Sequence, residues 1–67
     1  MEHRIKELRT SFNWTQEQLS ELLGVSRQTI ISIENGRYNP SLELAFKIAK
    51  LFHLSIEEVF IFEKGEN

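Results

Sequence analysis

The chain has no cysteine, one proline and only two histidines. Without cysteine it forms neither a disulfide nor a thiolate–metal site, and His3 and His53 are too few and too distant for a zinc site. No metal and no cofactor are therefore expected. The longest apolar run, Val59–Phe62, is far shorter than the roughly 20 residues that span a bilayer. Since the charged start Met1–Arg4 does not resemble a signal peptide, we expect a soluble, cytoplasmic protein without a membrane partner.

The short length also argues against catalysis. A chain of 67 residues forms one small domain that can hardly surround a large catalytic cleft. It lacks a cysteine nucleophile, and neither histidine has a visible acid–base partner, so no catalytic residue and no enzyme activity are expected. His53 is interpreted as a partly buried residue at a helix end. Well-packed helices or oligomerisation must then keep the chain folded.

The charge balance is slightly acidic and uneven. Ten acidic residues, all glutamate, exceed eight basic ones and give a formal net charge of −2. DNA-binding domains are usually basic on at least one face, so this total does not favour DNA. Residues 1–54, however, carry seven bases and six acids, whereas residues 55–67 carry one base and four acids. The excess acidity therefore lies at the C-terminal end.

Helix start signals divide the chain into five short helices. Apolar residues at i, i+3 and i+7 predict the first helix over about Glu2–Ser11. Thr15 with Gln18, and Ser55 with Glu58, have the spacing of capping boxes, which predicts the starts of the second and fifth helices. Serine caps are expected for the third and fourth helices. These two caps are Ser26 and Ser41.

The second and third helices are joined by a very short connection. Gly24 can supply the left-handed residue that ends the second helix, and only Val25 separates it from the next cap, Ser26. The third helix is predicted to run through Asn35, with Gly36 as its terminator. So short a link does not lay two helices antiparallel and suits the steep crossing of a helix-turn-helix unit.

The outward face of the third helix is short and rich in side chains that both donate and accept hydrogen bonds. At about 100° per residue, Ile30 and Ile33 point into the core. The opposite face holds Gln28, Asn35, Ile31 and Ser32, with Arg27 and Thr29 at its edges. Glutamine can read adenine in the major groove, arginine guanine, and serine either base; ordinary solvated surface is the alternative. Ile31 either contacts a thymine methyl group or packs against the second helix.

Three stretches of the sequence, taken in order and spacing, resemble the phage-repressor/Cro-type helix-turn-helix family, also called the xenobiotic-response-element family. The stretches are Thr15–Leu19, Leu22–Ile30 and Ile33–Ser41. The likeness covers about Arg4–Phe60 and is greatest to compact bacterial members, which are stand-alone DNA-binding regulators without a ligand domain. It implies an all-α, repressor-like bundle of five short helices in residues 1–60, followed by a C-terminal extension of residues 61–67.

The resemblance also implies roles for individual residues. Gln16 matches a glutamine that touches a phosphate and braces the recognition helix, and Arg9 and Glu34 match a structural salt bridge between the first and third helices. The sequence departs from the family at two positions. Ser20 stands where the family prefers alanine because two helices approach closely, and serine is small enough to fit. Ile31 replaces a commonly small or polar residue, which leaves the base preference open. The positions that match base-facing residues are Arg27, Gln28, Ile31 and Ser32. Those that match the loop along the DNA backbone are Asn35, Arg37, Tyr38 and Asn39.

The expected function is sequence-specific binding to double-stranded DNA by a transcriptional regulator, a repressor that occupies a promoter as a homodimer. Ile61 and Phe62 favour β structure, and a lone strand needs a partner, so we expect them to pair with the same strand of a second chain. A hydrophobic contact at the helix end and a frayed tail are the alternatives, and without the tail the interface is expected on Leu51 and the fourth helix. A second hypothesis is an antitoxin-like module that binds a toxin and its own operator. Activation through contact of the glutamate-rich end with polymerase also stays open.

Overall fold

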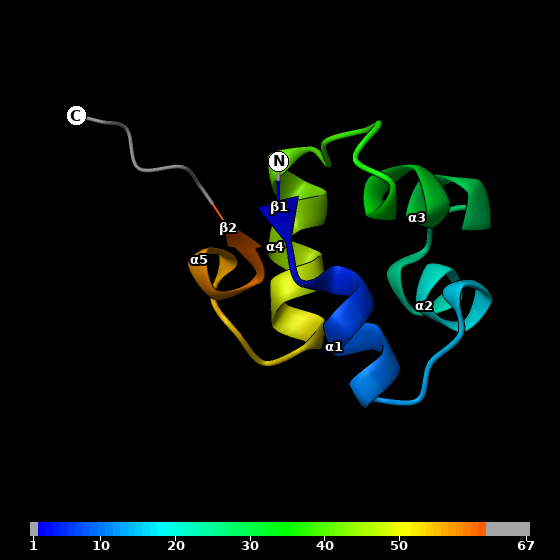
Figure 1. The fold of residues 1–67 in the computed structure, drawn as a ribbon, viewed down its shortest axis with the longest axis horizontal. Coiled ribbons are helices and arrows are strands. Elements are labelled where there is room, and N and C mark those ends of the chain that lie inside the picture. Colours follow the sequence, from blue (N-terminus) through cyan, green and yellow to red (C-terminus); the bar gives the residue numbers. More distant parts are fainter. Residues whose placement is uncertain (1, 62–67) are drawn as a thin grey trace.

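The computed structural model describes residues 2–61, which form five helices and two short strands. Figure 1 shows α4 in the middle of the molecule, with α2 and α3 on one side and α5 and β2 on the other. The all-α fold of five short helices is thereby confirmed, with one small sheet added. The elements are β1 (Glu2–His3), α1 (Ile5–Ser11), α2 (Gln16–Leu23), α3 (Arg27–Glu34), α4 (Leu42–Leu51), α5 (Ile56–Val59) and β2 (Phe60–Ile61).

Four of the helices begin at hydroxyl caps, as the sequence predicts. Each cap oxygen accepts a hydrogen bond from the amide three residues further on. In α2 the Thr15 amide also donates to Gln18 Oε1 at 2.9 Å, and in α5 the Ser55 amide donates to Glu58 Oε1 at 2.8 Å. Both capping boxes are therefore closed. Each cap satisfies amides that the first turn leaves unpaired, which contributes about 0.5–2 kcal/mol.

The first helix begins at Ile5, so the predicted start at Glu2 is wrong. Glu2 and His3 form β1 instead, which pairs antiparallel with β2 in the register Glu2 to Ile61 and His3 to Phe60. Arg4 offers no side-chain cap, and the apolar spacing of the helix fits only from Ile5 onward. The strand expected at the C-terminal end therefore finds a partner at the N-terminal end of the same chain.

The ends of α1 and α4 have the same backbone geometry. Asn13 and His53 adopt left-handed conformations, with φ of 61° and 60°. The amides of Trp14 and Leu54 then each donate to the carbonyl five residues back, at 3.0 and 2.9 Å. His53 is exposed rather than partly buried, so it ends α4 through its backbone alone.

The core is built from every helix and from β2. Ile30 and Ile33 of α3 are buried as the wheel predicts, and Phe60 closes the core from β2. Ser20 of α2 is also buried, and its hydroxyl donates to the Glu17 carbonyl at 2.7 Å, so it fits without an unpaired polar atom. The largest fully buried side chains are Phe60, Ile5, Leu19, Ile30, Ile33, Ile48 and Val59. Within residues 2–61, no helix combines the length and apolar content that a membrane span requires.

Candidate nucleic-acid interface

The connection between α2 and α3 fixes how these helices cross. Gly24 ends α2 in the left-handed conformation, with φ of 74°, which strains any residue with a side chain. The Val25 amide then donates to the Ser20 carbonyl at 3.0 Å, and Ser26 caps α3 at once. The two helices therefore form a compact unit at one end of the molecule (Figure 1).

Burial on one side of α3 leaves its other side open. Because Ile30 and Ile33 are in the core, Arg27 and Gln28 point outward and are exposed. Ser32 and Ile31 are half-buried. Ile31 thus packs partly against the protein while part of it stays accessible, so both readings of this residue retain support.

A shallow hollow of about 260 Å³ lies beside Gln28. Ser26, Thr29 and Ser32 of the α3 region line it, and Tyr38 forms a wall from the following loop. The hydroxyl oxygens of Ser26 and Thr29 are 3.0 Å apart and share a hydrogen bond. Hydroxyl and amide groups thus lie together next to the outward face of α3, where they can form hydrogen bonds with polar groups of a bound molecule.

The loop after α3 is held against the helix by its backbone. The amide of Gly36, at φ 77°, donates to the Ile33 carbonyl at 3.0 Å, and the Arg37 amide donates to the Ser32 carbonyl at 2.9 Å. The side chains of Asn35, Arg37, Tyr38 and Asn39 are all exposed. The structure therefore brings the four predicted backbone-contacting residues next to the end of α3.

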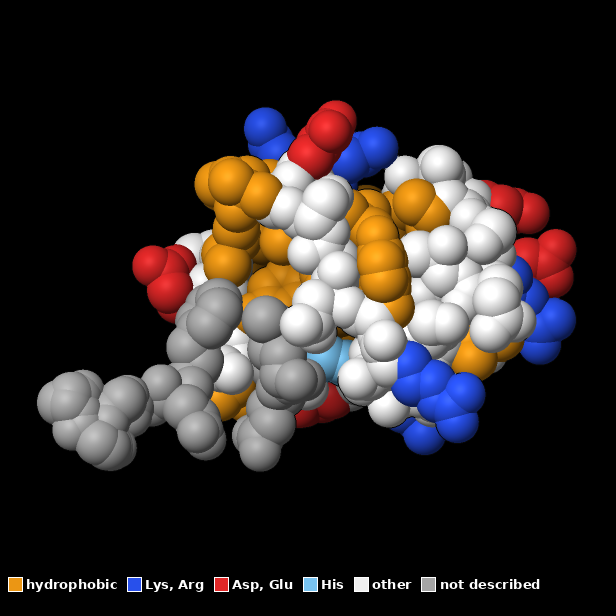
Figure 2. Space-filling view, turned by 90° about the horizontal axis from the view of Figure 1, so that it is seen from above, with side chains coloured by type: hydrophobic (Ala, Val, Ile, Leu, Met, Phe, Trp, Pro, Cys, Tyr) orange, Lys and Arg blue, Asp and Glu red, His pale blue; other side chains and the backbone are white. Residues whose placement is uncertain are grey.

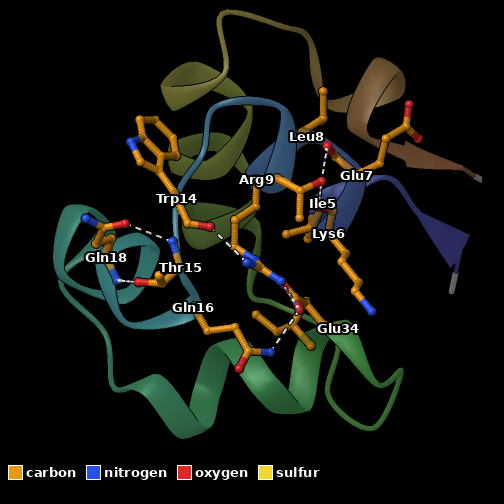
Figure 3. Close-up of polar contacts among 12 residues, drawn as sticks. Ile5, Lys6, Glu7, Leu8, Arg9, Trp14, Thr15, Gln16, Gln18 and Glu34 are labelled. Atoms are coloured by element: carbon orange, nitrogen blue, oxygen red, sulfur yellow. Dashed lines mark hydrogen bonds and ion pairs between the residues drawn. The ribbon is translucent and has the colours of Figure 1, made fainter.

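An ion pair ties α1 to α3 at the rear of this surface (Figure 3). Arg9 donates from Nε to Glu34 Oε2 at 2.8 Å, from Nη2 to Glu34 Oε1 at 3.3 Å, and from Nη1 to the Trp14 carbonyl at 2.8 Å. The Arg9 and Glu34 side chains are only 10% and 4% exposed. Gln16 Nε2 donates to Glu34 Oε1 at 3.0 Å, which adds α2 to the brace. The structure thus joins the residues predicted as salt bridge and brace.

A second hollow, of about 390 Å³, opens at the start of α2. It is lined by Arg9, Thr15, Gln16, Glu17 and Arg27. Two guanidinium groups and the positive end of a helix favour an anion here, whereas the Glu17 carboxylate opposes one. Gln16 therefore lies where it can both brace α3 and face a phosphate.

One contact behind α3 was not predicted. His3 Nε2 lies 2.8 Å from the Ile33 carbonyl, and the Ile5 amide donates to His3 Nδ1 at 3.3 Å. Its ring also meets Phe60 edge-on, with centroids 6.3 Å apart. His3 thereby links the small sheet to the C-terminal end of α3. A single histidine before a helix has no periodic signal that could have revealed this.

The predicted dimer residues fall at the end of the described chain. Ile61 lies in β2 opposite Glu2 and is 45% exposed, whereas Phe62 lies outside the described residues. In the part of the chain that the structure describes, no three histidine or carboxylate side chains are grouped to hold a metal ion.

Comparison with known proteins identifies the class. The helix-turn-helix family model matches residues 5–59, so the chain belongs to this family, as the resemblance implies. HTH-type transcriptional regulators of Methanocaldococcus jannaschii and Archaeoglobus fulgidus are 58% and 54% identical over 66 residues. These matches cover 98% of this chain, and 100% and 93% of the relatives.

Solved structures agree with this assignment. The restriction-modification controller protein C.AhdI of Aeromonas hydrophila is 34% identical with a TM-score of 0.75, over 82% of this chain and 83% of its own. A transcriptional regulator of Listeria innocua is 26% identical with a TM-score of 0.76, over 100% of this chain and 68% of its own. The chain is therefore a DNA-binding transcriptional regulator of the helix-turn-helix class.

Proposed function

We propose that the chain represses transcription as a homodimer that recognises a specific duplex sequence and occupies a promoter. The observation that carries this proposal is the orientation of α3. Burial of Ile30 and Ile33, together with the brace at Glu34, directs Gln28 and Arg27 outward on one rigid face. Like other regulators, it would act in the cytoplasm where the chromosome lies, and no catalytic step is needed.

Base recognition is assigned to the outward side chains of α3 in the major groove. Gln28 has the donor and acceptor that pair with adenine, and Arg27 has the donors that pair with guanine. Ser32 lies one turn further along and can contact either base. The accessible part of Ile31 suits the methyl group of thymine. These roles follow the predicted base-facing set.

Contacts to the DNA backbone are assigned to both ends of the helix-turn-helix unit. Gln16 and the first-turn amides of α2 would hold one phosphate, since helix starts bind anions through their free amides. The exposed side chains of Arg37, Tyr38 and Asn39, with Asn35, would follow the strand beyond α3. Such contacts from amides and polar groups compensate for the small number of bases in this chain.

A homodimer is proposed because one recognition helix reads only a few base pairs. Two-fold dimers bind half-sites one helical turn apart, about 34–36 Å. Residues 1–60 would form the DNA-binding domain and residues 61–67 an extension. Strand pairing through Ile61 and Phe62 of two chains stays a prediction. It is no longer needed to complete β2, since β1 already supplies a partner within the chain.

Selection of bound sequences from random duplexes tests the proposal. We expect enrichment of a two-fold related sequence, and lower reporter expression when that sequence is placed in a promoter. Failure to enrich any sequence would refute specific recognition, and higher expression would replace repression with activation through polymerase.

A protein-binding role is the second candidate, and the exposed apolar side chains of α4 support it. Leu42 and Phe46 are 69% and 57% exposed. An antitoxin-like regulator would cover such residues with a toxin. Co-expression with the product of the neighbouring gene, followed by co-purification, tests this alternative.

A further inference from the structure

A third hollow, of about 290 Å³, lies between α3 and α4. Val25 lines it from the turn after α2, Thr29 from α3 and Tyr38 from the loop that joins α3 to α4. Glu43 and Lys47 line it from α4. The hollow thus places charged groups of α4 beside the helix-turn-helix unit.

This hollow is continuous with the one beside Gln28. Thr29 and Tyr38 line both, so the Tyr38 side chain separates the outward face of α3 from the hollow at α4. Tyr38 is 46% exposed and belongs to the loop to which contacts with the DNA backbone are assigned. A DNA strand that follows this loop would therefore also pass over the far side of Tyr38, next to α4.

Lys47 brings an unpaired cation to this far side of Tyr38. Glu43 lies four residues before it on α4, which is a spacing at which glutamate and lysine can pair on a helix. Among the residues that the structure describes, however, only Arg4 and Arg9 form ion pairs with carboxylates. The exposed Lys47 ammonium is therefore available to a negatively charged group from outside the chain.

We infer that Lys47 holds a phosphate of the DNA strand beyond Tyr38 and thereby adds α4 to the DNA-contacting surface. The inference rests on the proposed placement of α3 in the major groove and extends its contacts to the backbone. A lysine ammonium binds phosphate as a point charge. Such contacts fix the position of a recognition helix without selecting bases. Lys47 is thus a positioning residue, whereas Gln28 selects a base.

Lys50, one turn further along α4, lies in different surroundings. It lines a separate hollow between α4 and α5, next to Leu54 and Ile56. Figure 2 shows hydrophobic side chains gathered toward the α5 end of the face it presents, and mostly polar ones toward α2 and α3. Both lysines are exposed, but of the two only Lys47 lines the hollow beside the helix-turn-helix unit.

The salt dependence of binding to a duplex of arbitrary sequence tests this contact without any assumption about the preferred bases. Each neutralised phosphate contributes about 0.9 to the slope of the logarithm of the binding constant against the logarithm of the salt concentration. We expect Lys47→Gln to reduce this slope by about one and to weaken binding about five- to ten-fold near 0.1 M salt, as the loss of one released counterion implies.

Lys50→Gln is the matched control, because it removes the same charge from the same helix. It should leave the slope unchanged, and the circular dichroism of both variants should equal that of the wild type. A Lys47→Gln variant with the slope of the wild type overturns the inference. Equal losses in the two variants also overturn it, since they would show an effect of net charge alone.

Glu43 provides a second test of where the phosphate lies. Its carboxylate lines the same hollow as Lys47 and opposes an anion there. Glu43→Gln should therefore strengthen binding about two- to five-fold, as expected for the removal of a like charge several ångströms away in water. Glu57→Gln is the control of equal charge, because Glu57 lines the hollow between α4 and α5. Equal effects of the two substitutions overturn the placement of a phosphate beside Lys47.

Base selection separates this inference from the function on which it rests. Lys47→Gln should select the same sequence from random duplexes as the wild type, because a phosphate contact carries no base information. A changed preference overturns the positioning role of Lys47. If the wild type itself selects no sequence, specific recognition is refuted, while the salt slopes of Lys47→Gln and Lys50→Gln still decide whether α4 contacts the backbone.

Discussion

Replacing Arg9 with methionine leaves the Glu34 carboxylate buried without either of its guanidinium hydrogen bonds. Gln16 alone would still donate to it, and the Trp14 carbonyl would also lose its donor. Breaking a buried ion pair from one side costs about 3–5 kcal/mol, because an uncompensated charge remains in the protein. A domain of this length has a total stability of about 3–10 kcal/mol. The single substitution should therefore remove a large share of the folding free energy.

Removing both charges together should cost far less. In a variant that combines Arg9→Met with Glu34→Leu, no buried charge is left unpaired, and apolar groups fill similar volume. Such replacements of buried pairs are often neutral or stabilising. We expect the double variant to stay within about 1.5 kcal/mol of the wild type. It should nevertheless bind DNA more weakly, since Gln16 loses the carboxylate that holds it against α3.

Urea unfolding followed by the fluorescence of Trp14, the single tryptophan, measures these differences. The matched control is Arg4→Met, because Arg4 forms an exposed pair with Glu7 at 3.4 Å, with side chains 40% and 67% exposed, and its only other side-chain hydrogen bond within the described residues is to the exposed Glu58 carbonyl at 3.1 Å. Exposed pairs contribute about 0–1 kcal/mol, so this control should change little. The reasoning is refuted if Arg9→Met costs no more than the control, or if the double variant is as unstable as Arg9→Met.

Further predictions concern recognition, assembly and backbone strain. Gln28→Ala should weaken the binding free energy by about 1–3 kcal/mol and reduce the discrimination between bases at one or two positions of the site, measured by repeating the selection. Arg37→Ala should weaken binding to all duplexes alike. It should also reduce the slope of the logarithm of the binding constant against the logarithm of the salt concentration by about one, measured by titration at several salt concentrations. Deleting residues 61–67 should produce a monomer by sedimentation, because it removes the proposed pairing of Ile61 and Phe62 between two chains; a truncated chain that stays dimeric would move the contact to Leu51 and α4. His53→Gly should stabilise the fold by about 0.5–1 kcal/mol in urea, because glycine relieves a left-handed backbone. Asn13→Gly should gain less, since asparagine tolerates that conformation better.

Local signals made the helices predictable. A cap such as Thr15 binds the amide three residues further on, so it depends only on residues that are close in the sequence. Both predicted capping boxes are present. The orientation of α3 was predictable for a similar reason, since Ile30 and Ile33 define the buried side of one short helix. The Arg9 and Glu34 pair, 25 residues apart, came from the family resemblance and from no local pattern.

Contacts between distant ends of the chain were not predictable in this way. The partner of β2 is a strand of two residues, too short for any alternation to appear, and it replaced the expected first turn of α1. Leu42 shares the apolar spacing of the buried face of α4 and was expected on it, yet it is 69% exposed, because an amphipathic pattern defines the centre of a buried stripe better than its edge. The apolar hollow between α4 and α5, lined in part by Phe46 and Leu54, depends on how these two helices pack, which residue spacing alone does not define.

The end of α3 is held from two sides by neighbouring residues, and this bears on how the protein recognises DNA. His3 binds the Ile33 carbonyl from the small sheet, while Arg9 and Gln16 bind the adjacent Glu34 from α1 and α2. Helix α3 therefore has little freedom to shift relative to β1, α1 and α2. A helix fixed in this way loses little conformational entropy on binding, so affinity and base preference depend on the outward side chains rather than on refolding. In the proposed homodimer, the distance between the two recognition helices would then depend on how the chains associate, so the spacing of the selected half-sites should report on the dimer contact.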